Sequence, residues 1–515
     1  MKKTNLIVTL ICCFFAACQP TYPPFIEALD HLKDQTEAPF YHGVASGDPL
    51  PDAVIIWTRV TPPSRVPSIA VNWEISADKS FSEVIQSGAV TTDSTRDYTV
   101  KVDVKALNPG TPYYYRFSAL EASSPIGRTK TAPKSGAVSF AVVSCSNYEW
   151  GYFNAYQAIA QRIDLDAVLH LGDYIYEYGP GSYGDTTLNR INIPAKEIIT
   201  LSDYRTRYAQ YRLDKDLKAA HASVAFINIW DDHEIANDSY KTGAQNHQED
   251  EGSYETRKSA AVKAYYEWMP IRESETLYRK FDYGNIAEVF MMDERLEGRT
   301  SPVDSLKDPN INDASRSMLG EGQLNWLLNG LEESPARWKV IGNQVIFSYL
   351  NWGFEPSFTI NLDSWDGYPY EQNKISSHIK DSNIDNVVFV TGDTHSSWAF
   401  EVTNDPFQSY DPETSEGAFA VEFGTTSINS ANSNERASDE EVLEHESKIV
   451  NSPVNPHLKY ANMRDHGFLV LTLTEDQAKA EWNIVSTVRD KQFNTTVDKT
   501  LTVNSGEVKL RGVNK

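Results

Sequence analysis

The chain has 515 residues, more than one ordinary hydrophobic core accommodates, so at least two domains are expected. It carries 47 Lys and Arg against 71 Asp and Glu, which gives a formal net charge of −24. Because so acidic a chain repels nucleic acid, we expect no nucleic acid among its binding partners. If the protein binds an anion such as phosphate, it needs local positive charge, and metal ions can supply it.

The first twenty residues, MKKTNLIVTLICCFFAACQP, have the pattern of an export signal. The apolar stretch after Lys2 and Lys3 is shorter than the ~20 residues of a permanent membrane span. Small residues before Cys18 resemble a bacterial lipobox, so we expect residues 1–17 to be a signal peptide and Cys18 to carry the lipid. Residues 18–38 would then be a polar tether. The alternative is plain cleavage that releases a secreted chain.

These features predict an exported protein, anchored by lipid to the periplasmic or cell-surface face of a bacterial membrane. Membrane contact is expected through the N-terminal lipid only, and the protein is expected to be a monomer. Lys2 and Lys3 do not form a twin-arginine signal.

Residues 39–131 alternate between apolar and polar side chains in short runs, at 53–60, 70–77, 97–104 and 107–119. Short strands separated by turn residues are typical of a small β-sandwich of the fibronectin or immunoglobulin type. Leu107, Gly110, Thr111 and Tyr113 resemble a corner in which a tyrosine hydroxyl ties a turn to its strand. We interpret this module as a scaffold.

From residue 137 to residue 515 the pattern is that of an α/β catalytic domain. VSFAVVSCS, a segment with helical spacing, and DAVLHLGD predict a βαβ unit with parallel strands. Further near-continuous apolar runs predict strands that are covered on both faces, at 223–234, 285–295, 337–348 and 386–397. Helical segments are expected at 257–269 and 321–331, and the acidic run at 437–448 is expected to be a solvated helix.

Chemically reactive side chains follow four of these apolar runs, at the point where each run ends. They are Cys145, then Asp173 and Tyr176, then Asp232 and His233, and finally Asp393 and His395. In an open α/β sheet, loops at the carboxyl ends of the strands converge on one crevice. Glycines before Asp173 and Asp393 would let the backbone turn sharply there. We therefore expect these side chains to share one site.

A thiolate, a phenolate, an imidazole and several carboxylates combine soft and hard metal ligands. This mixture favours a transition metal beside a hard divalent cation, and two ions about 4 Å apart can activate water and polarise a phosphoryl oxygen. Each residue alone also has a simpler explanation: Cys145 as core, Asp173 or Asp232 as a cap, Tyr176 as an aromatic rim. Their joint occurrence at four strand ends favours the metal site.

Several motifs together resemble the alkaline phosphatase D (PhoD-like) phosphatase/phosphodiesterase family, which is related to the metallophosphoesterases and purple acid phosphatases. They are FYHGVASGDP, Cys145, HLGDYIYEYG, WDDHE, YYEWMPIR, MMDER and GDTHS. The resemblance implies an α/β fold, an αββα metallophosphoesterase sandwich preceded by a small all-β sandwich. It also implies hydrolysis of phosphomonoesters or phosphodiesters by a metal-bound hydroxide.

The resemblance further implies Fe³⁺ and Ca²⁺ as cofactors, with roles for seven residues. Iron would be bound by Cys145, Tyr176 and His395; Asp173 would bridge the metals; Asp232 and Asp393 would bind the second ion; and His233 would contact the phosphoryl oxygens and protonate the leaving alkoxide. The related metallophosphoesterases have Asp and His where this chain has Cys145, which leaves the identity of the first metal open.

Other points stay open at this stage. Asp231, Asn237 or Asp238 would complete the second metal's coordination, and Arg272 and Arg295 would contact either substrate phosphate or structural carboxylates. The aromatic segment 351–370 is the expected rim of the site. The natural ester is open too, including a phospholipase D-like or wall-polymer substrate. An alternative of another class is a non-catalytic surface lipoprotein stabilised by calcium, for which Cys145 and His233 would be dispensable.

Overall fold

The computed structural model describes residue 25 and residues 27–353, 359–450 and 452–513. The predicted signal peptide, Cys18 and the first part of the predicted tether lie outside the described residues. Within the described part of the chain, every helix is too short or too polar to span a bilayer.

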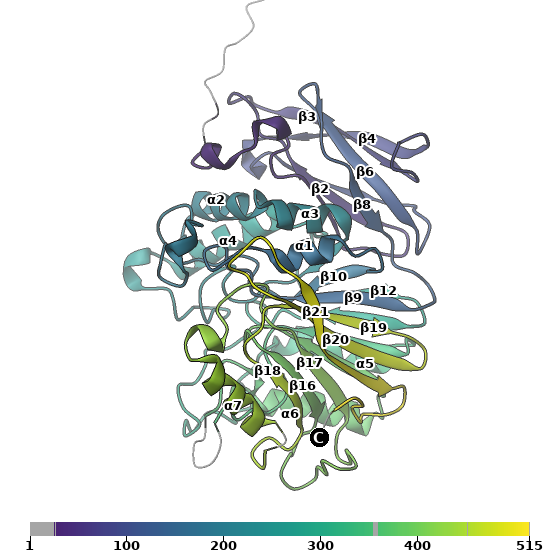
Figure 1. The fold of residues 1–515 in the computed structure, drawn as a ribbon, viewed down its shortest axis with the longest axis vertical. Coiled ribbons are helices and arrows are strands. Elements are labelled where there is room, and N and C mark those ends of the chain that lie inside the picture. The colour runs from purple at the N-terminus through teal and green to yellow at the C-terminus, as the bar shows by residue number, and fades with distance from the viewer. Residues whose placement is uncertain (1–24, 26, 354–358, 451, 514–515) are drawn as a thin grey trace, which may run out of the picture.

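Two large β-sheets form the body of the molecule (Figure 1). Over the described residues, the first has nine strands in the order β21 (Thr495–Asn504), β20 (Gln477–Val485), β19 (Gly467–Leu473), β9 (Val138–Val143), β10 (Ala167–His170), β11 (Phe226–Asn228), β1 (Val44–Gly47), β2 (Val54–Arg59) and β5 (Thr99–Val104). The second has seven, in the order β12 (Arg279–Tyr283), β13 (Ala287–Met291), β14 (Trp338–Asn343), β15 (Val387–Thr391), β17 (Ala420–Gly424), β16 (Ser397–Val402) and β18 (Leu458–Asn462).

The two sheets bury one continuous apolar core between them. Phe140 and Leu471 of the first sheet belong to the same buried cluster as Val289, Val340 and Phe423 of the second. Each such side chain contributes about 1.5–3 kcal/mol when it is fully removed from water. This burial on both faces explains why the strands are near-continuous apolar runs.

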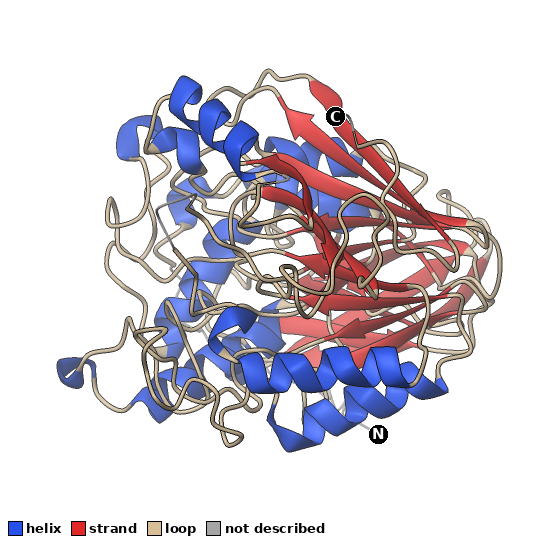
Figure 2. Cartoon of the chain, turned by 90° about the horizontal axis from the view of Figure 1, so that it is seen from below, coloured by secondary structure: helices blue, strands red, loops and turns tan. Residues whose placement is uncertain are grey.

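Helices cover the outer faces of both sheets, as Figure 2 shows. The side of the nine-stranded sheet carries α1 (Asn154–Ala160), α2 (Leu201–Arg212), α3 (Lys215–Ser223) and α4 (Tyr254–Trp268). The seven-stranded sheet is covered by α5 (Gly320–Glu333) and α6 (Pro369–Asp381), and α7 (Asp439–Ile449) packs on β16. Short 3-10 helices are η1 (Asp30–Leu32), η2 (Gln35–Glu37), η3 (Ser94–Arg96), η4 (Thr186–Leu188), η5 (Glu249–Glu251), η6 (Trp365–Gly367) and η7 (Ser433–Glu435). The predicted αββα sandwich is confirmed.

The predicted helices at 257–269, 321–331 and 437–448 are confirmed as α4, α5 and α7. The sequence did not predict α2, because its buried face includes Arg207, Gln210 and Arg212, which interrupt the apolar periodicity. The helix begins at a capping box in which the Thr200 side chain accepts the Asp203 N–H.

The strand directions bring chemically active loops to one edge. β9 and β10 pair in parallel, as predicted, and β10 pairs in parallel with β11. In the second sheet β13, β14, β15 and β17 are also parallel. A parallel bridge between Ser144 and Ser427 joins the ends of β9 and β17, so the carboxyl ends of both sheets meet there.

The N-terminal module is a β-sandwich, as expected. Its outer sheet has the strands β4 (Val84–Thr92), β3 (Ile69–Ser76), β6 (Pro112–Ala119), β7 (Ala122–Ser123) and β8 (Gly127–Lys130), and it packs against β1, β2 and β5. The Asn108 N–H donates to the Tyr113 hydroxyl at 2.9 Å, which confirms the tyrosine corner. β1 also pairs with β11 through Gly47 and Phe226, so this module shares the nine-stranded sheet with the domain that follows it.

The predicted tether extends too far along the chain, because residues 27–38 pack on the N-terminal module. Leu29 is buried, and Glu27 Oε1 lies 2.6 Å from Nη2 of Arg59. Lys33 Nζ lies 2.5 Å from Glu27 Oε2. A buried arginine such as Arg59 needs a carboxylate partner, and this segment provides one. The polar composition of the segment gave no sign of that partner.

Candidate active site

A cavity of about 390 Å³ opens where the strands of both sheets end. Five of the predicted site residues line it: Asp173, Asp232, His233, Asp393 and His395. The other two predicted metal ligands, Cys145 and Tyr176, are fully buried and contact residues that line the cavity. The structure thus brings together all seven side chains that follow the four apolar runs.

Four of these residues have a left-handed backbone. The φ angles of Cys145, Asp173, Asp393 and His395 are 61°, 54°, 62° and 54°. This region costs a residue with a side chain about 1–3 kcal/mol, and such strain persists where the surrounding structure fixes it. The strands β9, β10 and β15 therefore end in sharp turns that direct these side chains toward the cavity.

Glycine is required for different reasons at the two Gly-Asp pairs. Gly172 has φ +110°, and a Cβ there would lie 2.3 Å from the Cβ of Asp231. Gly392 does not need a positive φ, so the expectation of a glycine turn at this position is wrong. A Cβ on Gly392 would lie 2.8 Å from Cβ and Oγ of Ser144, so glycine there allows close packing, and the turn is made by Asp393 itself.

Gly172→Ala is expected to lower the free energy of unfolding by about 2–5 kcal/mol, since the strained φ and the contact with Asp231 both add to the cost. Gly136→Ala is the matched control, because Gly136 has φ +92° but a Cβ added there would meet nothing within 4 Å. The control should lose only about 1–2 kcal/mol. Denaturant unfolding of both variants measures the difference; equal losses would contradict the close-packing argument.

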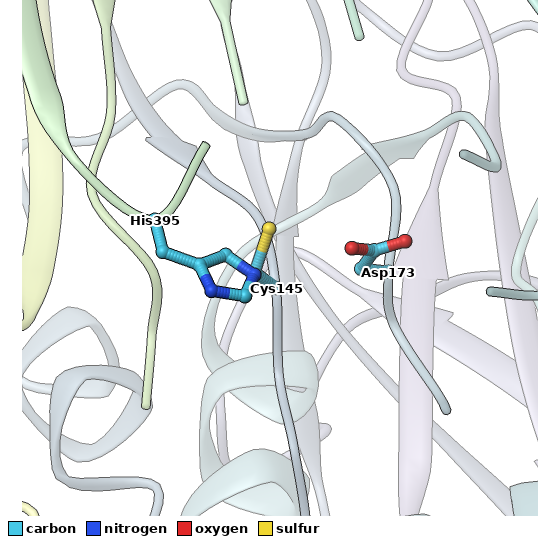
Figure 3. A group of neighbouring side chains, drawn as sticks. All are labelled: Cys145, Asp173 and His395. Carbon is cyan, nitrogen blue, oxygen red and sulfur yellow. The ribbon is translucent and has the colours of Figure 1, made fainter. Parts of the chain in front are cut away.

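The first group of candidate metal donors contains Cys145, Asp173 and His395 (Figure 3). A ligand atom of each lies within 4.8 Å of the other two. The Tyr176 hydroxyl joins them, 3.1 Å from Asp173 Oδ2 and 3.2 Å from His395 Nε2. Thiol, phenol, imidazole and carboxylate therefore converge on one point.

His395 is oriented by the backbone. Its Nδ1 lies 2.8 Å from the Ala431 carbonyl oxygen, which can only accept, so Nδ1 carries the proton. Nε2 is then left with its lone pair toward Tyr176 and the candidate metal position. Metal-binding histidines commonly have this arrangement.

A second group contains Asp173, Asp232 and His233, again with one ligand atom each within 4.8 Å. Asp232 Oδ2 accepts the Asp238 N–H at 2.6 Å, while Oδ1 is buried and has no hydrogen-bond partner among the described residues. Asp393 lies outside both compact groups, although it lines the same cavity.

The acid–base behaviour of the site fits bound cations. Burial, and then neighbouring charge from Asp173, raises the pKa of the Cys145 thiol and of the Tyr176 phenol well above their usual ranges. Burial raises the pKa values of Asp173 and Asp393 well above normal as well, with further contributions from nearby carboxylates. Metal ions reverse this situation by stabilising the anionic forms, so the donors and the orphaned Asp232 oxygen fit a metal cluster.

Arg295 supplies positive charge behind the carboxylates. It is fully buried, donates to Asp231, and its Nη1 donates to both carboxylate oxygens of Asp363, at 3.0 and 2.8 Å. Its Nη2 lies 4.0 Å from Asp232 Oδ1 and 3.8 Å from Asp393 Oδ1. Arg295 is thus a structural ion-pairing residue.

The structure distinguishes the other residues whose roles the sequence left undecided by whether they line the cavity. Asp231 is held by Arg295, whereas Asn237 and Asp238 line the cavity. Burial, with repulsion from Asp363 and Asp232, raises the pKa of Asp238 to about 7. Arg272 bonds to Asp48 and Asp103 and is not among the residues that line the cavity.

His233 is held by a buried glutamate. Its Nδ1 lies 2.7 Å from Glu177 Oε2, and Glu177 Oε1 accepts the Asn237 N–H and an Asn246 amide N–H, both at 2.8 Å. Burial opposes protonation of His233, but the carboxylates of Asp232, Glu177 and Asp173 outweigh it and raise the pKa of His233 well above normal. The ring is therefore fixed with a proton on Nδ1 and with Nε2 available to a ligand.

Comparison with known proteins agrees with this geometry. A model of the PhoD-like phosphatase matches residues 140–482, and a model of the N-terminal domain of PhoD-like phosphatases matches residues 27–133. The chain belongs to the PhoD-like phosphatase family. It is therefore an enzyme that hydrolyses phosphate esters and depends on metal ions.

The chain is 38% identical over 482 residues to alkaline phosphatase D of Bacillus subtilis (strain 168), covering 88% of this chain and 78% of that protein. A solved structure of PhoD superposes with a TM-score of 0.83 at 34% identity and covers 93% of each chain. Purple acid phosphatase PPD1 from yellow lupin shares the fold, with a TM-score of 0.56 at 14% identity over 91% of this chain and 74% of that one. The alternative of a non-catalytic lipoprotein is set aside, because the PhoD-like family is enzymatic.

Sequence reasoning missed several residues of this PhoD-like site. Glu177 is adjacent to Tyr176 in the run HLGDYIYEYG, and its position next to a predicted metal ligand could have identified it as a site residue. Tyr183 and Arg436 line the cavity from loops that showed no pattern. The expected aromatic rim at 351–370 contributes Trp352, while residues 354–358 of it lie outside the described part.

Proposed function

We propose that this PhoD-like phosphatase holds Fe³⁺ and Ca²⁺ and acts on phosphodiesters in preference to phosphomonoesters. The observation that carries the proposal is the convergence of a thiol, a phenol, an imidazole and several carboxylates on one cavity. Cys145, Tyr176 and His395 would hold iron, because anionic sulfur and phenolate oxygen suit a transition metal of high charge. Asp232 and Asp393 would hold calcium, which prefers carboxylate oxygens.

Asp173 is suited to contact both ions. It belongs to both groups of candidate donors, and its Oδ2 accepts from the Tyr176 hydroxyl at 3.1 Å. When bound, the two ions would supply positive charge to the phosphoryl oxygens and lower the pKa of water.

His233 would act on the leaving group. Glu177 accepts the Nδ1 proton, so a proton at Nε2 is the one available for the departing alkoxide. Tyr176 and Tyr183 hold the imidazole plane, with ring centroids 4.2 and 6.3 Å from that of His233. The ring therefore has one orientation in which to meet the ester.

The cavity walls favour a diester. Tyr178, Tyr183 and Trp352 provide apolar surface for a second organic group, and Arg436 is the one Lys or Arg among the described residues that line the cavity. A diester brings a second organic group that can pack on this apolar surface, whereas a monoester brings none. Hydrolysis of bis(p-nitrophenyl) phosphate and p-nitrophenyl phosphate, with metal analysis of the same sample, tests the proposal. Faster turnover of the monoester, or a sample active without iron and calcium, would overturn it.

Tyr176→Phe is expected to abolish any visible charge-transfer absorption of the iron-loaded protein while Cys145 and His395 still hold part of the metal. The physical reason is that phenylalanine lacks the oxygen that would donate charge to iron. Absorption spectra and iron content of the variant and of Tyr178→Phe, which keeps the Tyr176 phenol, check this. An unchanged spectrum in Tyr176→Phe would exclude phenolate ligation.

We propose, as well, that the mature protein is a monomeric lipoprotein attached to a bacterial membrane through Cys18. The signal-like N-terminus and the small residues before Cys18 support this proposal. Labelling with a radioactive fatty acid is expected for the full chain and not for Cys18→Ser. Equal labelling of both would contradict it.

A further inference from the structure

Arg436 stands out at the rim of the cavity. It follows η7, whose cap residue Asn432 and first residue Ser433 also line the cavity. Arg436 is the one Lys or Arg among the described lining residues, and its side chain is solvent-exposed. In a chain with a net charge of −24, this places isolated positive charge beside a strongly acidic site.

Two carboxylates near Arg436 in sequence, those of Glu435 and Asp439, form hydrogen bonds with other residues. Glu435 accepts the Asn432 N–H at 2.7 Å and lies 3.0 Å from His466 Nε2. Asp439 accepts an amide N–H of Asn434 at 3.1 Å. Within the described chain, Arg436 itself forms no ion pair at 4.0 Å or less. The guanidinium charge is therefore available to a ligand.

The position of Arg436 is set by Tyr183. Nη2 of Arg436 lies 3.4 Å from the Tyr183 hydroxyl, and the guanidinium lies 5.8 Å from the centre of that ring. The same hydroxyl lies 3.4 Å from His395 Nδ1. Arg436 is thus separated from a candidate iron ligand by a single hydroxyl group. Because Tyr183 lies between Arg436 and the candidate metal position, the guanidinium is better placed to bind a charged group beside the reacting phosphate than to bind the reacting phosphate.

We propose that Arg436, with Ser433 and Asn432, forms a subsite for an anionic group that the substrate carries beyond the phosphorus under attack. The planar guanidinium fork matches a carboxylate or a second phosphate, and the Ser433 hydroxyl can donate to the same group. Asn432 is held in place, since its Oδ1 accepts from the Ser427 hydroxyl at 2.8 Å. The inference rests on the proposed phosphodiesterase function and specifies its substrate as a diester with an additional negative charge.

The test uses the metal-loaded full chain and three p-nitrophenyl phosphodiesters at constant ionic strength. The second ester group is a plain alkyl chain, a carboxylate-bearing alkyl chain, or choline. The wild-type kcat/KM is expected to be highest for the carboxylate-bearing diester and lowest for the choline diester. Arg436→Gln should reduce the anionic-to-choline preference by about 5- to 30-fold, since the pair is charge-assisted but exposed to solvent. Arg436→Lys should restore part of the preference.

Arg511→Gln is the charge-matched control, because Arg511 is exposed, pairs with Glu507 at 2.6 Å and is not among the residues that line the cavity. It should leave the preference unchanged. If Arg436→Gln lowers kcat/KM equally for all three esters, Arg436 binds the reacting phosphate or acts structurally, and the subsite is overturned. If the wild type shows no charge preference, the subsite is overturned while the phosphodiesterase function stands. If the wild type hydrolyses none of the three diesters, the proposed function itself fails.

Discussion

Asp173→Asn is expected to abolish binding of both metals and to lower kcat/KM by at least about 100-fold. Even residues that only orient metal ligands cost 10- to 100-fold in affinity or activity, and Asp173 belongs to both groups of candidate donors. Its carboxylate is almost fully buried, so water cannot take its place at low cost. Metal analysis and steady-state hydrolysis of bis(p-nitrophenyl) phosphate measure the two losses.

Asp393→Asn is the matched variant for this prediction. Asp393 lines the cavity but lies outside both compact groups, so its loss should remove calcium and leave most of the iron. After the metals have been stripped, Asp173→Asn is expected to unfold at a higher temperature than wild type at neutral pH, because the buried Asp173 carboxyl, whose pKa burial raises, must take up a proton on folding and asparagine need not. Full iron and calcium content in Asp173→Asn would contradict its assignment to both ions.

The strand-end residues were predictable because one physical rule governs them. Parallel strands place their carboxyl ends at the same edge, so Cys145 after β9 and Asp173 after β10 are neighbours. Asp393 follows β15 of the second sheet and joins them because the carboxyl ends of the two sheets meet. The apolar runs identified the strands, because burial on both faces removes polar positions. The strained φ angles of the same residues follow from the sharp turns at those ends, and the letters alone do not reveal them.

Two cavity residues that the sequence did not predict lie on irregular loops. Tyr183 and Arg436 are 253 positions apart, and the path of their two loops depends on tertiary packing. The pairing of β1 with β11 was not predicted for a similar reason, because a single register pair joins these two strands. Arg295 could be assigned either to substrate or to structure until Asp231 and Asp363 were seen beside it.

Glu234 shows how the acidic site is held in shape. Its two carboxylate oxygens accept the backbone N–H groups of Asp173, Tyr174 and Asp231, at 3.1, 2.6 and 2.9 Å. One side chain thus fixes the loops after β10 and β11 relative to each other. Burial raises the pKa of Glu234 to about 8, although these hydrogen bonds act to lower it. The loops that present the metal donors are therefore positioned by the protein itself.

His233→Asn is expected to reduce kcat by about 10²- to 10⁴-fold for diesters with alkoxide leaving groups, the usual range for loss of a general acid. The loss should be smaller for p-nitrophenolate, since a stable leaving group needs little protonation. Glu177→Gln should show the same dependence with a smaller amplitude, because the carboxylate that fixes the Nδ1 proton is replaced by an amide. A series of esters with leaving groups of increasing pKa measures this slope.

Tyr178→Phe is the control for both variants, since the Tyr178 ring lies 5.5 Å from that of His233 but makes no hydrogen bond to it in the described structure. The slope against leaving-group pKa should steepen in His233→Asn and in Glu177→Gln and stay at the wild-type value in Tyr178→Phe. A merely structural role for Glu177 would lower kcat by one factor across the whole series. A His233→Asn slope equal to that of wild type would show that the proton reaches the leaving oxygen from another group, because the imidazole would then have no part in cleavage of the ester bond.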